Sequence, residues 1–239
     1  MAEVALDDAW LTGPEAARLA SMRFPKRRLE SRLGRWTAKS AIARALDRPF
    51  DADGLRSVAV RNASDGAPEA FVGDRPAPVV ISMTDRADWA VCVVATGVDA
   101  VGCDLELVEP RSHRFVEDWF TPAEQEVVAS SPEEHDLWAN LIWSAKESAL
   151  KVLRQGLRLD TRTVEVTFGD EEHDGWRSLL VTSTTGETFP GWWARHGDFV
   201  LTTAATSPVP PPTPLTTPTP LATAIPTHTW LSAAAGEQG

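Results

Sequence analysis

Two periodicities of apolar residues alternate along the chain up to about residue 206. Apolar residues recur at three- and four-residue steps over residues 23–48, and again over about 134–153, which predicts two amphipathic helices. Short apolar runs bounded by turn residues lie between and after these helices, a pattern typical of strands. The strands expected from these runs are 55–62, 89–95, 101–106, 163–168, 178–183, 188–194 and 199–205.

The order of these elements favours an α+β fold. Each half offers helices and several strands without the regular strand–helix alternation of a doubly wound sheet. We expect an N-terminal half over residues 1–98 and a C-terminal half over 99–206, and no convincing internal repeat is visible. Proline and threonine dominate from Ser207 onward, and no charged residue appears before Glu237. Residues 207–239 are therefore expected to form an extended or disordered tail.

Charge and hydropathy restrict the partners of the chain. The formal net charge is −11, which disfavours indiscriminate binding to nucleic acid or to an anionic membrane. The N-terminus carries Asp7 and Asp8 instead of a basic segment followed by an apolar core. No apolar run reaches the roughly 20 residues that span a bilayer. These patterns predict a cytoplasmic protein, and Cys92 and Cys103, both in apolar runs, are interpreted as small hydrophobic residues.

Two pairs of charged residues are the candidates for chemistry. Asp104 and Glu106 lie two apart in an expected strand and so share a face, where hard carboxylate oxygens suit Mg²⁺ or Mn²⁺. In the downstream helix, Glu147 and Lys151 are four apart and also share a face. Alone, this second pair would be an ordinary surface ion pair. A third carboxylate and a lysine beside a carboxylate pair are, however, what a metal-bound diphosphate requires.

Three ordered motifs resemble those of the 4′-phosphopantetheinyl transferases, specifically the larger two-domain type. That family carries G-[VIC]-D-x-E, F-[ST]-x-x-E and W-[ST]-x-K-E-[SA]-x-x-K, matched here by residues 102–106, 120–124 and 143–151. Gln155-Gly156-Leu157 is similar to the glycine turn that follows the helix in the family. The similarity runs from about residue 23 to about residue 205. Thr121 and Glu124 also form a helix capping box, which favours a structural role for Glu124.

The resemblance implies both a fold and a reaction. Two similar α+β halves would pack as a pseudo-dimer within one monomeric chain, with the active site in the cleft between them. Coenzyme A would bind there and donate 4′-phosphopantetheine to a serine of an acyl- or peptidyl-carrier protein, releasing adenosine 3′,5′-bisphosphate. Asp104, Glu106 and Glu147 would hold Mg²⁺, and Glu147 would act as the base directly or through a water. Lys151 would neutralise developing charge, with Lys146 assisting from the rim.

The resemblance also suggests residues that bind the donor. The basic segment 23–48 would lie near the 3′-phosphate and adenine of coenzyme A, with Lys26 and Arg35 as the preferred positions; a solvated helix face is the alternative. Ser82 begins a segment that the family places near the phosphates. Two departures occur, because Ala67 replaces a usual basic residue and Asp85 a usual histidine. Arg86 is a candidate for the missing positive charge.

Two other functions use the same residues. A non-catalytic binder of coenzyme A or of a carrier protein is suggested by the two departures, although a pure binder has no need of a costly carboxylate cluster. A Mg²⁺-dependent phosphohydrolase of nucleotide diphosphates would use the same charges with water as the acceptor. The sequence ranks the transferase first. It does not identify the carrier protein, whose contacts in the family would involve residues 111–119.

Overall fold

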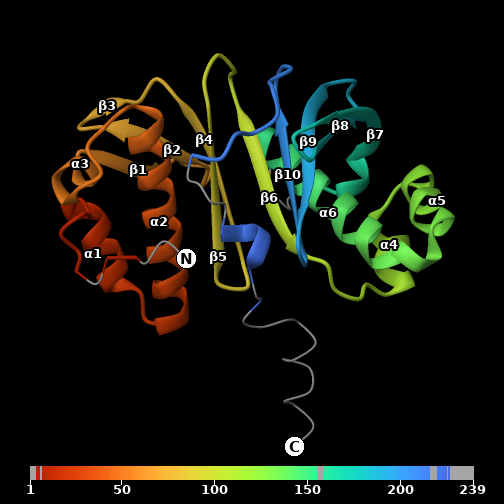
Figure 1. Cartoon of the computed structure of the whole chain (residues 1–239), viewed down its shortest axis with the longest axis horizontal. Coiled ribbons are helices and arrows are strands. Elements are labelled where there is room, and N and C mark those ends of the chain that lie inside the picture. The colour runs from red at the N-terminus through yellow and green to blue at the C-terminus, as the bar shows by residue number, and fades with distance from the viewer. Residues whose placement is uncertain (1–3, 6, 155–158, 216–219, 225, 227–239) are drawn as a thin grey trace, which may run out of the picture.

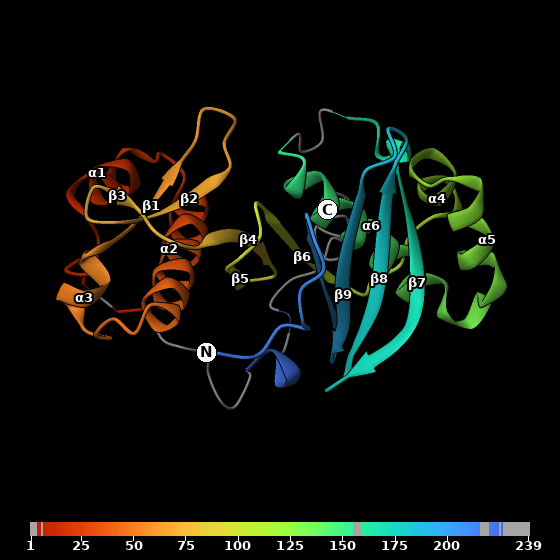
Figure 2. The same ribbon diagram turned by 90° about the horizontal axis from the view of Figure 1, so that it is seen from above.

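The chain folds into helices and antiparallel sheets arranged as two halves side by side (Figures 1 and 2). The computed structural model describes residues 4–5, 7–154, 159–215, 220–224 and 226. Among these residues the sheets have the strand orders β1-β2-β3, β4-β5 and β6-β10-β9-β8-β7. The α+β class predicted from the sequence is confirmed.

The first half consists of α1 (Gly13–Ser21), α2 (Pro25–Ala45), α3 (Ala52–Arg56), β1 (Val58–Asn62), β2 (Pro68–Val72), β3 (Arg75–Pro76), β4 (Val80–Arg86) and β5 (Trp89–Ala95). The long helix α2 packs against β1, β4 and β5. The hydrophobic core of the first half includes Trp10, Ala38, Ile42, Leu55 and Val58, which are all almost completely buried. The helix predicted over residues 23–48 is thus confirmed, although it begins slightly later, at Pro25, and ends slightly earlier, at Ala45.

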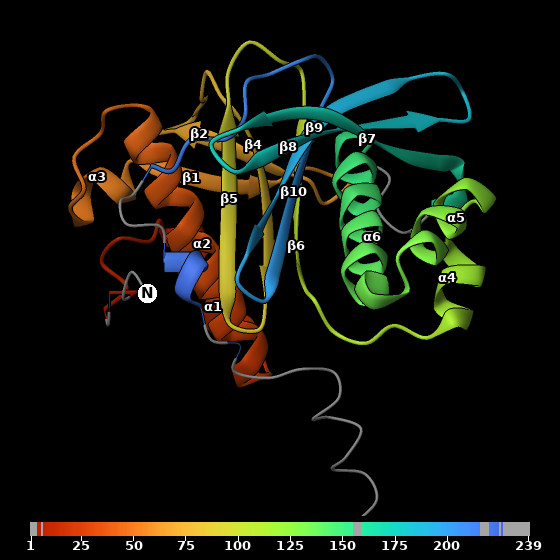
Figure 3. The same ribbon diagram turned by 45° about the vertical axis from the view of Figure 1, so that its right-hand side comes forward.

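The second half consists of β6 (Val101–Leu107), α4 (His113–Trp119), α5 (Pro122–Ser130), α6 (His135–Val152), β7 (Val164–His173), β8 (Trp176–Ser183), β9 (Thr188–His196) and β10 (Phe199–Ala205). Short 3₁₀ turns cover Pro132–Glu134 and Thr161–Thr163. Figure 3 shows α6 lying along one face of the five-stranded sheet, with α4 and α5 further out. The predicted glycine turn at residues 155–157 lies outside the described residues.

The halves meet where the β4–β5 hairpin lies against β6. No backbone ladder joins β4 to β6 among the described strands; side-chain hydroxyl groups make the connection instead. The Cys103 amide donates to Ser82 Oγ at 2.9 Å, and the Leu105 amide donates to Thr84 Oγ1 at 3.2 Å. These bonds satisfy backbone donors of β6 that would otherwise be buried without partners.

The two halves repeat one buried ion pair. In the first half, the capping-box residue Glu15 of α1 binds Lys39 of α2 at 2.6 Å and accepts from the Val60 amide at 3.0 Å. The second half repeats this arrangement with other residues: Glu124 of α5, Lys146 of α6 at 2.7 Å, and the Val166 amide at 2.8 Å.

The sequence carries the same repeat, because Trp36-Thr37-Ala38-Lys39 corresponds to Trp143-Ser144-Ala145-Lys146. The expectation that no internal repeat would be visible was therefore wrong. The signal was missed because only four positions carry it within an otherwise divergent pair of helices.

Part of the tail belongs to the folded structure. Leu221, in a 3₁₀ turn over Pro220–Thr223, is 6% exposed and joins a cluster that contains Trp89 of the first half and Leu107 and Trp192 of the second. The indole of Trp192 also donates to the Val209 carbonyl at 2.8 Å. Residues 208–214 have no regular secondary structure, whereas Leu221 covers an apolar surface that the composition of the tail did not predict. None of the described helices is long and apolar enough to cross a membrane.

Candidate active site

The site is built where α6 crosses β6. Gly102 makes this close approach possible, because a Cβ there would lie 1.8 Å from the Ser148 carbonyl oxygen of α6. Ser144 then donates to the Asp104 carbonyl at 3.0 Å and lies 2.9 Å from Thr202 Oγ1 on β10. A small residue and two hydroxyl groups thus fix the helix over the strand, so that the two charged pairs meet.

Asp104 and Lys151 form the direct link between the strand and the helix. Lys151 Nζ lies 2.8 Å from Asp104 Oδ1 and donates to the Cys103 carbonyl at 2.8 Å. Burial acts to lower the pKa of Lys151, but the charge and hydrogen bond of Asp104 outweigh it and raise the pKa. Thr84 of the first half donates to the same Asp104 oxygen at 3.2 Å. The lysine therefore stays charged beside the carboxylate.

Glu106, on the same strand, is held by two arginines. Its Oε2 lies 3.3 Å from Arg86 Nε, contributed by the first half, and 3.4 Å from Arg111 Nη2, in the loop before α4. Burial, followed by the charge of Asp104, raises the pKa of Glu106 to about 7 against the opposing effect of the two arginines. The effect of Asp104 on the pKa of Glu106 is what two carboxylates on one face of a strand produce.

Glu147 on α6 completes the acidic group. Burial, followed by the charge of Asp104, raises the pKa of Glu147 to about 7, while Lys151 acts to lower it. Its Oε1 is buried and has no hydrogen-bond partner. A carboxyl group with a pKa near neutrality can accept or release a proton at physiological pH.

The carboxylates suit a divalent cation chemically but are not already gathered into one cluster. Asp104 Oδ2, like Glu147 Oε1, is buried without a hydrogen-bond partner, and a hard cation would satisfy both oxygens. Among the described residues, no group of three or more His, Cys, Asp or Glu side chains is arranged to hold a metal ion. Lys151, Arg86 and Arg111 provide the positive charge beside the acids instead. That the three acids converge on one ion stays a prediction.

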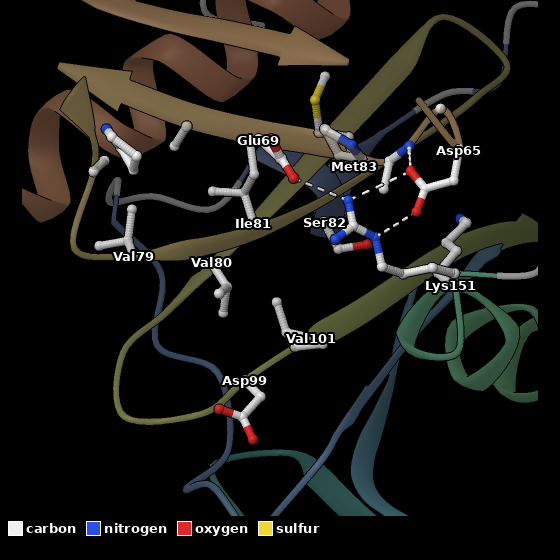
Figure 4. A pocket seen from close by; sticks show the side chains of 18 of the residues that line it. Asp65, Glu69, Val79, Val80, Ile81, Ser82, Met83, Asp99, Val101 and Lys151 are labelled. Carbon is white, nitrogen blue, oxygen red and sulfur yellow. Dashed lines mark hydrogen bonds and ion pairs between the residues drawn. The ribbon is translucent and has the colours of Figure 1, made fainter. Parts of the chain in front are cut away.

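A cavity of about 880 Å³ lies beside this group, between the halves (Figure 4). Its walls come from residues 65–71, 76–77 and 79–83 of the first half, and from residues 99–101, Lys151 and Arg154. Ser82 and Lys151 are the predicted site residues that line it. Because Lys151 also binds Asp104, the cavity and the acidic group share one side chain.

Two other predicted donor-binding residues lie elsewhere. Lys26 is exposed and lies 3.8 Å from Glu30 one turn along α2. Arg35 is buried, donating to the Val60 carbonyl and, at 3.0 Å, to Asn62 Oδ1. Neither lines the cavity. Arg35 therefore has a structural role in attaching α2 to β1, which its position in a basic run did not reveal.

Lys146 and Arg86 are both engaged by carboxylates. Lys146 is completely buried, pairs with Glu124, and donates to the Thr161 and Val164 carbonyls at 2.9 and 2.6 Å. The predicted rim position of Lys146 is therefore wrong, since this lysine points into the core beneath α5. Arg86 binds Glu106 and Glu109, so its charge stabilises the acidic group.

Sequence reasoning missed three residues of the site. Thr84, Arg111 and Arg154 reach it from β4, from the loop before α4 and from the end of α6. For Arg154, the signal was present, because it follows Lys151 by three residues and so continues the same helical face. The other two depend on tertiary contacts that no local pattern encodes.

The fold and the site thus define an α+β protein with an acidic group beside a cavity between two halves. The model of the 4′-phosphopantetheinyl transferase superfamily matches residues 100–204. A 4′-phosphopantetheinyl transferase of Bacillus subtilis is 29% identical over 86 residues, which are 36% of this chain and 38% of that protein. Over residues 100–204 the chain is therefore similar to this superfamily, in agreement with the resemblance seen in the motifs. The chain aligns with less than half the length of this relative.

Proposed function

We propose that the protein transfers 4′-phosphopantetheine from coenzyme A to a serine of an acyl- or peptidyl-carrier protein. The observation that carries this proposal is the position of Lys151, which lines the cavity and binds Asp104 at 2.8 Å. Lys151 places the end of the motif of residues 143–151 at the wall of a cavity large enough for an extended ligand, and its contact with Asp104 links the motif of residues 102–106 to that wall. The family match over residues 100–204 supports the same activity.

The proposed reaction is a phosphoryl transfer in which Glu147 and Lys151 each have a defined role. The serine oxygen attacks the phosphorus on the pantetheine side of the diphosphate, and the bond from that phosphorus to the bridging oxygen breaks. Adenosine 3′,5′-bisphosphate leaves with the bridging oxygen. Glu147, with its pKa raised to about 7, accepts the serine proton. Lys151 offsets the negative charge that develops on the leaving oxygen.

A divalent ion such as Mg²⁺ or Mn²⁺ belongs to this proposal. Asp104, Glu106 and Glu147 would hold it, and when bound it would draw negative charge from the diphosphate oxygens. The two carboxylate oxygens without hydrogen-bond partners support this assignment. Arg86 and Arg111 keep Glu106 in place from two directions.

A mass-shift assay tests the function. Apo carrier proteins of fatty-acid, polyketide and nonribosomal-peptide synthesis are incubated with the protein, coenzyme A and Mg²⁺, and intact masses are measured. A gain equal to one phosphopantetheine supports transfer. Release of phosphopantetheine without carrier protein would indicate a hydrolase, and binding of coenzyme A with no mass change on any carrier would indicate a binder.

Glu147→Gln is the variant that tests the assigned base. It keeps the side-chain shape but removes the proton acceptor, and loss of one such group in a closed site typically costs roughly 3–4 kcal/mol of barrier, about 10²–10³ in rate. We expect a folded protein with almost no transfer. Glu126→Gln, on the helix α5, is the matched control and should transfer at the wild-type rate. Wild-type turnover by Glu147→Gln would eliminate Glu147 as base.

A further inference from the structure

One cation of the cavity has no role in the chemistry described above. Arg154 follows the end of α6 and, like Lys151, lines the cavity on the side of the second half. It crosses to the first half, where Nε lies 2.8 Å from Asp65 Oδ2 and Nη2 lies 3.0 Å from Glu69 Oε1. Figure 4 marks these ion pairs with dashed lines at the labelled Asp65 and Glu69.

Both acidic partners also line the cavity. Asp65 lies in the β1–β2 turn, where its Oδ1 also accepts from the Ala67 amide at 3.0 Å, and Glu69 lies on β2. The side chains of Arg154, Asp65 and Glu69 are 42%, 31% and 45% exposed. Ion pairs exposed to this degree contribute little to stability, so their exchange for another anion is inexpensive.

A guanidinium group binds a phosphate in two-pronged fashion, with charge-assisted hydrogen bonds stronger than those between neutral groups. The cavity is therefore arranged so that an entering phosphate competes with two carboxylates for one arginine. The same carboxylates repel that phosphate for as long as the arginine does not neutralise them.

We propose that Arg154 binds the donor by exchanging its partners. When the donor enters the cavity, Arg154 releases Asp65 and Glu69 and binds a phosphate group of the donor instead. This inference rests on the proposed function, since coenzyme A is taken as the donor. In this arrangement Asp65 and Glu69 compete with the donor phosphate for Arg154. They therefore weaken donor binding and make the site selective for ligands that carry strongly anionic groups.

Opposite effects of the arginine and its partners are the signature of this exchange. Coenzyme A affinity is measured by titration calorimetry at fixed salt. We expect Arg154→Ala to weaken binding about tenfold, the scale of one charge-assisted hydrogen bond. The double variant Asp65→Asn/Glu69→Gln should bind about threefold tighter, because the arginine is then released. Repeating the titrations with dephospho-coenzyme A, which lacks the 3′-phosphate, tells which phosphate the arginine meets.

Two controls separate partner exchange from general electrostatics. Asp53→Asn/Asp74→Asn removes the same charge from the first half, at exposed acids that pair with Arg56 and Arg61 and do not line the cavity. In the Arg154→Ala background, Asp65→Asn/Glu69→Gln measures only the relief of repulsion between the two carboxylates and the phosphate, so it is the reference against which the gain with the arginine present is compared.

Unchanged affinity of Arg154→Ala would overturn the inference, as would an equal gain from the two double variants. A wild-type protein that takes up no coenzyme A would instead overturn the proposed function, so the two failures are distinguishable.

Discussion

The surroundings of Glu147 disfavour the charge of its carboxyl group. The side chain is largely buried, one of its oxygens has no hydrogen-bond partner, and Asp104 adds a like charge. Lys151 compensates only in part, so the pKa stays raised to about 7. The charged form of such a carboxyl group lowers the stability of the folded protein, whereas its raised pKa makes it useful as a base. Stability and activity often make opposite demands on functional residues in this way.

This conflict predicts how stability depends on pH. The pKa of Glu147 is about 7 in the folded protein against the usual 4.5, so the folded state favours the neutral form. The contribution of Glu147 to the free energy of unfolding is therefore fully present below the usual pKa of 4.5, and it is lost as the pH rises through about 7. With EDTA present, the melting temperature of the wild type should fall further between about pH 5 and about pH 8 than that of Glu147→Gln. Parallel curves for the two proteins would contradict this pKa.

Single residues were predictable from the sequence where local geometry alone decides. The spacing of Asp104 to Glu106 on a strand, and of Glu147 to Lys151 on a helix, fixes which face each pair shares. Ordered motifs then suggested that the two pairs meet, and the Asp104–Lys151 contact agrees. Lys146 was misjudged because a helix with two lysines does not reveal which one turns into the core.

At the scale of elements, the buried Glu–Lys pair is what attaches each capping-box helix to its long neighbour. The pair occurs as Glu15–Lys39 on α1 and α2 and as Glu124–Lys146 on α5 and α6. In each case the glutamate also accepts from a strand amide, so helix, helix and strand share one carboxylate. The family's F-[ST]-x-x-E motif therefore has a structural explanation here.

Lys146→Met tests that explanation. Removing the lysine leaves the charge of Glu124 buried without its partner, which typically costs about 3–5 kcal/mol. We expect the free energy of unfolding, measured in urea, to fall by this amount, and Lys39→Met to have a similar effect in the first half. The double variant Glu124→Gln/Lys146→Met should recover part of the loss, because the amide oxygen can still accept from Val166.

The same variants decide between the core and the rim for Lys146. A lysine on the rim would contribute to binding of coenzyme A and little to stability. Weaker coenzyme A binding with an unchanged free energy of unfolding would therefore restore the position expected from the sequence.

At the scale of the whole molecule, the two halves are held together by more than the site. On the sheet face opposite α6, Trp89 and Val91 of the first half pack with Leu105, Leu107 and Trp192 of the second. Periodicity predicted the strands that carry these residues. It could not predict their mutual packing, because strand patterns do not specify which sheets meet. The burial of Leu221 could not be predicted for the same reason, since the composition of the tail says nothing about an apolar surface elsewhere in the molecule.

Leu221 therefore tests whether the tail belongs to the fold. Burial of a leucine side chain contributes roughly 1.5–3 kcal/mol, and a carboxylate at that place adds the penalty of a buried charge. We expect Leu221→Asp to lower the melting temperature by several degrees, while Leu215→Asp, at an exposed leucine of the same tail, leaves it unchanged. Because the cluster joins β5 to β6, Leu221→Asp should also increase binding of a dye that reports exposed apolar surface. Equal melting curves for the two variants would show that the halves are held together without the tail.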